Sequence, residues 1–361
     1  MSKKPYLVIL VLIIALLLNI WINPSYIAQT NEQELKLTKI GQYNDGGKVV
    51  DMYIAENTAY VADWNEGLEI VDISDPTAPK ELGQYTIRYA RGIQVDGDTL
   101  YLSCNTNGLK ILNVNNPTNI VEIAHYQADG AHQLILNGNI GYLANWEFGL
   151  EILNLTDPSN PVKIGGYVDG GGVCTAQIND NLIYVAEYSK GLIILDISDP
   201  TNPIKIGEFH DGGESFSLHI IDNIAYIADR ADGLDIIDIS NPNNPLKLGN
   251  YNEGGIVSDV EVVGTNVFIA DWRKGFIVVD AANPENPVKL SLYNDGGYIS
   301  SVSIVENNAF VADNHDGLEI FQIWENNQNV SNTIFELPMI FLALVLLLFS
   351  KKKNNTIIET E

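Results

Sequence analysis

The chain has 361 residues, and its 20 basic and 46 acidic residues give a formal net charge of −26 at pH 7. This balance argues against a nucleic-acid partner, because a protein that binds nucleic acid presents a basic surface to the phosphates. The two cysteines, Cys104 and Cys174, are too few to indicate a disulfide framework, so the compartment has to be inferred from targeting segments.

Residues 1–30 have the features of a targeting segment. Lys3 and Lys4 precede an apolar run from Tyr6 to about Ile22, an order that is typical of secretory signal peptides and of signal anchors. Ala28 follows without a clear small-x-small cleavage site. The sequence therefore predicts either a signal peptide that is removed or an N-terminal signal anchor that is retained.

An internal repeat dominates residues 31–324. The repeat glycine, which is the Gly of a Gly-Leu or Gly-Phe pair, recurs every 41 or 42 residues, and an upstream aromatic residue keeps the same spacing. The seven glycines are Gly67, Gly108, Gly149, Gly191, Gly233, Gly275 and Gly317. Regular self-similarity of this length indicates a repeat architecture.

Each copy contains four short segments with the composition of β-strands. In the first copy they are VVDMYI at 49–54, TAYVAD at 58–63, LEIVDIS at 68–74 and KELGQY at 80–85. The segments are rich in β-branched and aromatic residues and are separated by turn-forming residues. Four strands in each of seven copies predict an all-β fold, a seven-bladed β-propeller of four-stranded antiparallel blades.

The two ends of the repeat array complement each other. The seventh copy ends at GLEIFQIWENN without a fourth strand, whereas an additional fourth-strand sequence, LTKIGQY, occupies 37–43 ahead of the first copy. We therefore predict that the N-terminal strand completes the seventh blade and closes the ring, which removes the open strand edges of an unclosed array.

The residues after the repeats are expected to form a polar linker at 325–333, an apolar segment at 334–353 and a short polar tail at 354–361. The uninterrupted apolar run from Leu337 to Phe349 would span about 20 Å as a helix, against roughly 30 Å of bilayer hydrocarbon. The segment is therefore either a transmembrane helix or a sorting tail. Lysines at both chain ends would face the cytoplasm under the positive-inside rule, which leaves the repeats outside the cell.

The third-strand segment LEIVDISDP at 68–76 returns as LIILDISDP, LDIIDISNP and FIVVDAANP. This motif resembles the LVIVD-repeat family of prokaryotic surface-associated β-propellers, and the resemblance extends over about 37–324. Two copies depart from the motif, since Asn113 and Gln322 replace its aspartate. The resemblance implies a propeller at the cell surface and implies no particular activity.

Acidic residues crowd the segment ADWNEGLEIVDISDP at 62–76 in a spacing that invites comparison with a calcium loop. The equivalent positions in other copies include Lys, Phe and Ile, and the D-x-D-x-D-G pattern of calcium loops is absent. We therefore interpret Asp63 as the cap of the turn before Gly67, and Asp75 as the residue that opens the next turn.

A second acidic set precedes paired glycines in the loops that enter the blades. Its members are Asp45, Asp169, Asp211, Glu253 and Asp295. In a structural interpretation the glycines supply positive φ angles and the acids cap the loops. In the alternative interpretation the carboxylates form a ring around the mouth of the central channel and bind a cation, with calcium as the candidate ion.

Aromatic residues recur three positions before the repeat glycine. Flat aromatic faces are frequent in binding hot spots, although each ring could instead cover the joint between neighbouring blades. In the second and third copies, the entrance loop carries a basic residue or a histidine, so it is less acidic than in the other copies. The predicted ligand-binding residues are Trp64, Trp146, Tyr188, Trp272, Arg91 and His132.

The sequence contains neither an HExxH nor a GxSxG motif, and we predict no catalytic residues. The expected function is a non-enzymatic binding, adhesion or scaffold module at the cell surface, anchored in the membrane by the hydrophobic ends and specific for a surface protein or glycan. The alternative is a calcium-dependent or enzymatic propeller that uses acidic residues at the channel mouth, with Asp51, Asp259 and His132 on inner strands.

Overall fold

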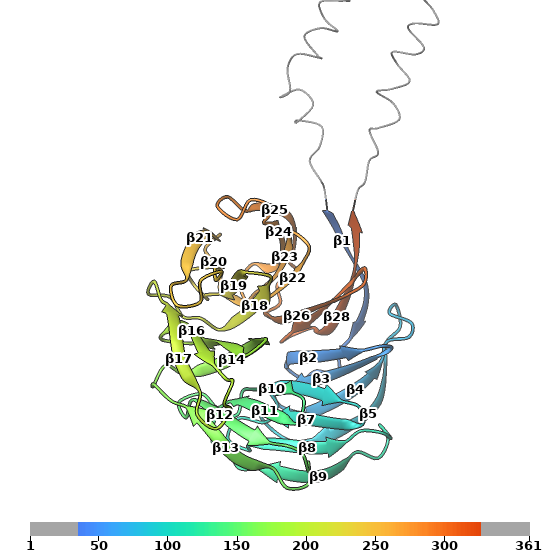
Figure 1. Ribbon diagram of the computed structural model, residues 1–361. Coiled ribbons are helices and arrows are strands. Elements are labelled where there is room, and N and C mark those ends of the chain that lie inside the picture. Colours follow the sequence, from blue (N-terminus) through green and yellow to red (C-terminus); the bar gives the residue numbers. More distant parts are fainter. Residues whose placement is uncertain (1–34, 326–361) are drawn as a thin grey trace, which may run out of the picture. The chain divides into compact units, whose positions relative to one another are not determined.

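The computed structural model describes residues 35–325, and within this range the chain forms 28 β-strands and no helix. The strands build seven four-stranded antiparallel sheets, which are arranged as blades around a common centre (Figure 1). The prediction of a seven-bladed β-propeller with four-stranded blades is thereby confirmed.

Each blade takes four strands in the order in which the sheet pairs them. Blade 1 contains β2 (Val49–Ala55), β3 (Thr58–Asp63), β4 (Gly67–Asp72) and β5 (Lys80–Thr86). Blade 2 contains β6 (Gly92–Asp96), β7 (Thr99–Ser103), β8 (Leu109–Asn113) and β9 (Val121–Tyr126). Blade 3 contains β10 (Gln133–Asn137), β11 (Ile140–Ala144), β12 (Leu150–Asn154) and β13 (Val162–Tyr167). Blade 4 contains β14 (Val173–Asn179), β15 (Leu182–Glu187), β16 (Gly191–Asp196) and β17 (Ile204–Phe209).

The remaining blades follow the same plan. Blade 5 contains β18 (Ser217–Ile221), β19 (Ile224–Ala228), β20 (Leu234–Asp238) and β21 (Leu246–Tyr251). Blade 6 contains β22 (Val257–Val263), β23 (Asn266–Asp271), β24 (Gly275–Asp280) and β25 (Val288–Tyr293). Blade 7 contains β26 (Ile299–Val305), β27 (Asn308–Asp313) and β28 (Gly317–Glu325), with β1 (Leu35–Tyr43) beside β28 in the same sheet.

The first strand of each blade lies nearest the axis, and these seven inner strands contact one another around the ring. The second strand turns back on the first, so that Val49 pairs with Asp63 in blade 1. The turn between the second and third strands therefore lies beside the entrance to the inner strand. Residues of both segments can consequently meet at one end of the channel.

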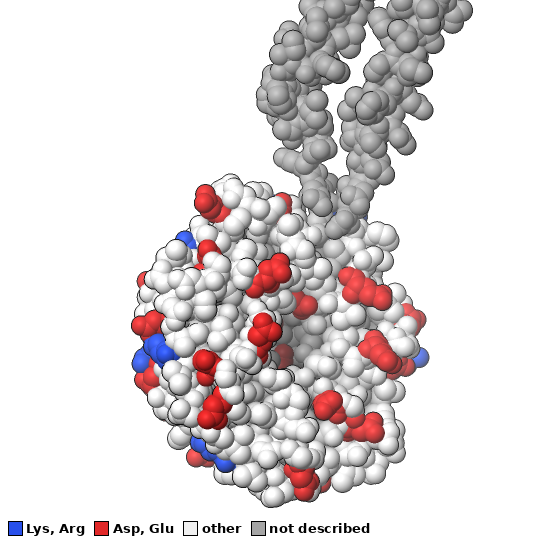
Figure 2. Space-filling view, in the orientation of Figure 1, with Lys and Arg blue, Asp and Glu red and all other residues white. Residues whose placement is uncertain are grey.

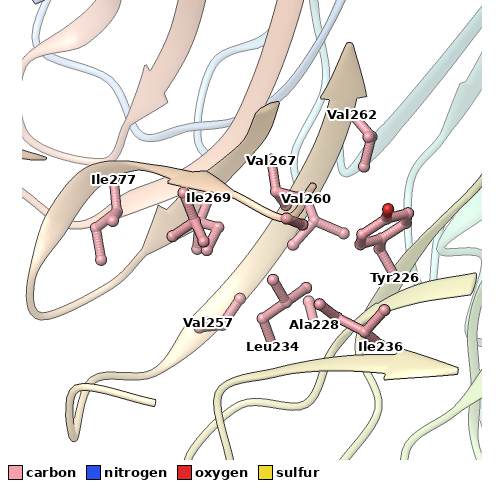
Figure 3. Packing of buried hydrophobic residues seen from close by; sticks show 12 residues of the cluster. Tyr226, Ala228, Leu234, Ile236, Val257, Val260, Val262, Val267, Ile269 and Ile277 are labelled. Carbon is pink, nitrogen blue, oxygen red and sulfur yellow. The ribbon is translucent and has the colours of Figure 1, made fainter. Parts of the chain in front are cut away.

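Seven clusters of buried apolar side chains hold the blades together, and each cluster occupies the joint between two neighbours. In the cluster of Figure 3, Ala228, Leu234 and Ile236 of blade 5 pack against Val257 and Ile269 of blade 6. The third strands are buried along almost their whole length, because a sheet covered on both faces has no solvent-exposed side. This accounts for the unbroken apolar character of the repeat motif.

Several predictions concern residues that the structure does not describe. They are the signal peptide or anchor at 1–30, the polar linker at 325–333 apart from Glu325, the apolar segment at 334–353 and the tail at 354–361. Within residues 35–325, no helix is long and apolar enough to cross a membrane.

Candidate functional site

The ring encloses a central cavity of ≈150 Å³ to which all seven blades contribute side chains. Figure 2 shows the molecule hollowed at its centre, with acidic side chains outnumbering basic ones on the face in view. Equivalent positions of the seven copies form a ring of lining residues at the start of the inner strands. That ring consists of Asp51, Gly92, Gln133, Thr175, Ser217, Asp259 and Ser301. The differences between copies therefore decide the chemistry of the cavity.

Hydrogen bonds connect several members of this ring across blade boundaries. Ser217 Oγ donates to Asp259 Oδ1 at 2.6 Å, and Ser301 Oγ lies 2.8 Å from Asp259 Oδ2 and 3.3 Å from Asp51 Oδ1. A serine hydroxyl has a single proton to donate. Ser301 can therefore bond both carboxyl groups only if one of them is protonated and donates to its oxygen.

The surroundings of the two aspartates favour such a shared proton. Burial, followed by the nearby Asp259 carboxylate, raises the pKa of Asp51 to about 7, although the Ile93 amide donates to Asp51 Oδ2 at 3.1 Å. Burial also raises the pKa of Asp259. On the same strand as Asp259, burial raises the pKa of Glu261 to about 7. Asp51, which lines the cavity, is therefore only partly ionised near neutral pH.

Arg91 stands immediately before β6 and places its guanidinium against two aromatic rings. The Cζ atom lies 5.9 Å from the ring centre of Trp64 and 5.5 Å from that of Phe216, which belongs to blade 5. Arg230 approaches the same Phe216 ring at 5.7 Å and also lies 5.6 Å from the Tyr188 ring. Cation–π contacts of this kind attract a guanidinium to the faces of aromatic rings.

The series of ring contacts continues beyond Tyr188. Trp146 lies 5.3 Å from Tyr188 in a tilted arrangement and 4.7 Å from His132 in a stacked one, measured between ring centres. A continuous belt of side chains in contact therefore runs through five blades. We call it the aromatic belt, and it consists of Trp64, Arg91, Phe216, Arg230, Tyr188, Trp146 and His132.

The six residues predicted to bind ligand occupy two kinds of position. Arg91, His132 and Trp272 line the cavity, and the Trp272 side chain is 39% exposed with its Nε1 donating to Ser300 Oγ at 3.3 Å. The other three, Trp64, Trp146 and Tyr188, belong to the aromatic belt without lining the cavity.

Two residues of the belt were absent from the predicted set. Arg230 occupies the repeat position of Trp64 and Trp146, and Phe216 occupies that of Arg91. Comparing the copies at these two positions could have identified both residues. Their contacts across the ring, however, depend on how far each side chain extends, which the sequence spacing does not reveal.

His132 and Cys174 both line the cavity in uncharged forms. Burial, reinforced by the charge of Arg91, lowers the pKa of His132 to about 2, so the imidazole is neutral at physiological pH. Burial raises the pKa of Cys174 to about 12, so the thiol stays protonated. Arg91 consequently provides the positive charge of the cavity wall.

The repeat sequence agrees with this architecture. A model of the LVIVD repeat matches the chain at residues 46–87, 87–128, 130–169, 170–211, 212–253, 254–295 and 296–333. The chain belongs to the LVIVD-repeat family. The resemblance of the third-strand motif to this family is thereby confirmed. No curated protein sequence matches the chain.

Solved structures share the fold of this LVIVD protein at 10% sequence identity. The WD40 β-propeller domain of Doa1 matches with a TM-score of 0.65 over 82% of this chain and 98% of that chain. The β-propeller domain of Cps50 (Swd1) from Myceliophteria thermophila gives 0.64 over 80% and 100%, and the computationally designed Ika8 protein gives 0.57 over 76% and 83%. At this identity the likeness shows a β-propeller fold alone.

The paired glycines of the LVIVD copies have two distinct structural roles. The first glycine adopts a positive φ, which is 103° at Gly296. The second allows a close approach, since a Cβ atom on Gly297 would lie 1.7 Å from Asp313 Oδ2. Asp313 in turn accepts hydrogen bonds from the amides of His315 and Asp316. Asp63 caps its turn in the same way through Oδ1, as the sequence predicted.

The five entrance-loop acids are not among the residues that line the cavity in the described structure. Four of them pair with lysines instead. The pairs are Asp169 with Lys190 at 3.4 Å, Asp211 with Lys247 at 2.6 Å, Glu253 with Lys289 at 2.7 Å, and Asp295 with Lys39 at 3.5 Å. Lys247 and Lys289 lie on the outermost strands β21 and β25, and Lys39 lies on β1.

Two groups of three carboxylates are close enough to hold a metal ion. They are Asp211, Asp229 and Asp235 in blade 5, and Asp295, Asp313 and Glu319 in blade 7. In each group a lysine ammonium already contacts two of the members: Lys247 lies 2.7 Å from Asp235, and Lys39 pairs with Glu319. The ammonium therefore supplies the positive charge that a cation would otherwise bring.

Blade 1 lacks this lysine, because Glu81 occupies the position of Lys39, Lys247 and Lys289. Glu69, the counterpart of Glu319, is 0% exposed, and no amide, hydroxyl or ammonium donor of the described residues bonds to either of its carboxyl oxygens. Burial, with the neighbouring Asp45, raises the pKa of Glu69 to about 9. The protonated form of Glu69 is therefore the one that the folded LVIVD protein accommodates at neutral pH.

Glu69→Gln should stabilise the protein increasingly as the pH rises. In the unfolded chain Glu69 ionises near its ordinary pKa of 4.5, whereas in the folded chain it stays protonated up to about 9. Folding thus takes up a proton between these values, and stability falls with pH by at most about 1.4 kcal/mol per pH unit. Because glutamine does not ionise, the variant does not show this decrease in stability as the pH rises. Denaturant unfolding at pH 5 and pH 8 measures the effect, with the exposed Glu66→Gln as control, and a pH-independent gain from Glu69→Gln would contradict the assignment.

Proposed function

We propose that this LVIVD protein is a cell-surface binding module. In this proposal an extracytoplasmic β-propeller, held at the membrane by the hydrophobic ends of the chain, binds a surface protein or glycan without catalysing a reaction. The observation that carries the proposal is the central cavity, where Arg91, Trp272 and a ring of hydroxyl and carboxyl groups converge beside the aromatic belt. Concave sites with aromatic walls and a few convergent polar groups are typical of ligand binding.

The targeting segments support the extracytoplasmic part of the proposal. Lys3 and Lys4 precede the first apolar run, and three lysines beginning at Lys351 follow the second. Under the positive-inside rule, this arrangement leaves the propeller outside the cytoplasm. The high negative charge of the chain suits a solvated surface protein, since like charges oppose self-association.

We further propose that β1 closes the ring by acting as the fourth strand of blade 7. The sheet order β1-β28-β27-β26 supports this assignment. Side-chain contacts add to it, because Lys39 of β1 pairs with Glu319 of β28 and Gln42 Nε2 donates to the Asp316 carbonyl oxygen. Both ends of the propeller would then meet in one blade, so that two terminal membrane segments would attach it at one place.

A non-enzymatic role agrees with the state of the potential nucleophile and base in the cavity. The Cys174 thiol, with a pKa of about 12, is not a thiolate at neutral pH. His132, with a pKa of about 2, is too weak a base to accept a proton from a hydroxyl or thiol group. The cavity therefore lacks the activated nucleophile and base pair of acyl-transfer enzymes.

One observation favours the second candidate function, an enzymatic or calcium-dependent propeller. Asp51 and Asp259 both line the cavity and share Ser301, and a carboxyl group with a pKa near 7 is suited to proton transfer at neutral pH. Carboxylate and hydroxyl oxygens are also the ligands that calcium prefers.

A calcium titration followed by thermal unfolding separates the two candidates. A cation site present only in the folded protein must raise Tm as the ion concentration rises. For a metal-independent binding module we expect Tm to shift equally with calcium chloride and with sodium chloride of the same ionic strength. A calcium-specific increase that Asp51→Asn abolishes would favour the second candidate.

Replacing cavity and belt aromatics tests the binding role. We expect Trp272→Ala and Trp64→Ala each to weaken binding to the cognate member of a surface glycan and protein panel by about tenfold or more, because buried aromatic contacts dominate such interfaces. Trp324→Ala is the matched control, since Trp324 is 50% exposed and does not line the cavity. Unaltered panel binding by correctly folded Trp272→Ala and Trp64→Ala proteins would refute the proposed site.

Lys39→Met tests the assignment of β1 to blade 7. It would leave Glu319, which is fully buried, without its ammonium partner, and we expect a loss of about 3 kcal/mol in the free energy of unfolding. The double variant Lys39→Met with Glu319→Gln should recover most of this loss. Lys36→Met, on the exposed side of the same strand, is the control. Equal small effects of both lysine variants would argue against the assignment.

A further inference from the structure

Arg91 is a cation in the cavity wall whose charge no carboxylate neutralises directly. Among residues 35–325, Arg230 has a carboxylate partner, Glu214, at 3.0 Å, whereas no carboxylate oxygen lies within 4.0 Å of the Arg91 guanidinium nitrogens. The neighbouring charge of Arg230 and, above all, burial lower the pKa of Arg91, but a guanidinium stays protonated in proteins. A partly buried and unpaired cation favours an anion beside it.

The surroundings of Arg91 determine which of its groups an anion can reach. The Cζ atom lies over the rings of Trp64 and Phe216, at 5.9 and 5.5 Å from their centres. Aromatic rings accept no ion pair, so these contacts leave the guanidinium N–H groups without an anionic partner. Two parallel N–H groups match the two oxygens of a carboxylate, and this bidentate geometry is more specific than a point charge.

The remaining lining is rich in hydroxyl groups and contains one exposed aromatic face. Ser217, Ser258, Ser300 and Ser301 contribute hydroxyls, and Trp272 presents its indole ring. Hydroxyls and the half-protonated Asp51 can both donate and accept hydrogen bonds, as ligand hydroxyls require. A volume of ≈150 Å³ is below the roughly 300–1,000 Å³ of pockets for drug-sized ligands, which favours a small molecule or a single terminal residue.

We propose that the central cavity binds a sugar acid. Its carboxylate pairs with the in-plane N–H groups of Arg91, its hydroxyls bond to the ring of serines and aspartates, and its apolar ring face packs against Trp272. This ligand assignment rests on the proposed binding function of the cavity. A phosphate fits less well, since a dianion would face one unpaired guanidinium together with Asp51 and Asp259.

Calorimetric titration of the full-length chain with sodium D-glucuronate and with D-glucose at pH 7 tests the proposal. We expect glucuronate to bind at least tenfold more tightly than glucose, and Arg91→Gln to reduce the glucuronate affinity at least tenfold. Arg88→Gln is the matched control, because Arg88 lies in the same entrance loop, is exposed and does not line the cavity. Equal affinities for the two sugars, no binding of glucuronate at millimolar concentration, or unchanged affinity in Arg91→Gln would each overturn the proposal.

A second variant keeps the test informative if Arg91→Gln does not fold. Arg91→Lys retains the positive charge but loses the planar fork, so we expect it to fold and to bind glucuronate severalfold more weakly than the wild type. Wild-type affinity in Arg91→Lys would show that no bidentate pair forms, which contradicts the proposal.

The pH dependence provides an independent readout. The groups that face Asp51 are Arg91 from blade 2, Asp259 with the nearby Glu261 from blade 6, and Ser301 from blade 7, while His132 stays neutral. Lowering the pH through 7 neutralises Asp51, the carboxyl group with a pKa of about 7 beside Arg91. Glucuronate affinity should therefore rise severalfold from pH 8 to pH 6, and less so in Asp51→Asn. A fall in affinity over this range would contradict the proposed placement of the carboxylate.

Two further comparisons identify the source of the sugar acid and distinguish failure of the ligand assignment from failure of the proposed surface-binding function. Equal or tighter binding of an oligosaccharide with a terminal glucuronate residue identifies the end of a glycan as the ligand, whereas binding of free glucuronate alone identifies a soluble sugar acid. If Trp272→Ala and Trp64→Ala abolish panel binding while Arg91→Gln keeps the glucuronate affinity of the wild type, the ligand assignment alone fails. If neither tryptophan variant changes panel binding, the proposed surface-binding function is refuted, irrespective of the measured glucuronate affinity.

Discussion

The packing of neighbouring blades on one another is the interaction on which the rest of the structure depends. The third strands are buried on both faces, and a cluster of apolar side chains fills every one of the seven joints, including that between Leu318 of blade 7 and Val49 of blade 1. Burial of this apolar surface stabilises each blade only when both neighbours are present. The ring therefore positions seven inner strands together, and no single blade could create the cavity.

This constraint leaves some positions free to vary. Residues in the joints have to be apolar, but one position near the start of each inner strand lines the cavity and is occupied by five residue types, which are Asp, Gly, Gln, Thr and Ser. At the periphery, lysines contact buried acids, since Lys247 of β21 lies 2.7 Å from Asp235 and Lys39 of β1 pairs with Glu319. Glu69 has no such lysine, and burial raises its pKa to about 9, against about 7 for Asp235 and Glu319.

The fold could be predicted from the sequence because a propeller repeats one pattern seven times, and the strand content of one copy then determines the whole. The turn role of Asp63 was predictable for the same reason, since a cap depends on residues only two or three positions away. Distances from the axis were not predictable. An entrance loop runs from the outermost strand of one blade to the innermost strand of the next, and the sequence spacing does not show that Asp211 in such a loop pairs with Lys247 on β21. The contact of Arg91 with Phe216 joins blades 2 and 5, and the local spacing of residues in the sequence does not predict it.

The same ring geometry explains why protonation in the channel is shared between blades. Ser301 can bond to both Asp51 and Asp259 only when one carboxyl group carries a proton, and the Arg91 charge favours ionisation of the nearer aspartate. An anion that neutralises Arg91 would remove this influence and favour protonation of Asp51, which would then donate to Ser301. Binding of such an anion would therefore be thermodynamically coupled to proton uptake at neutral pH. Because the groups involved come from blades 1, 2, 6 and 7, this coupling would require the assembled ring.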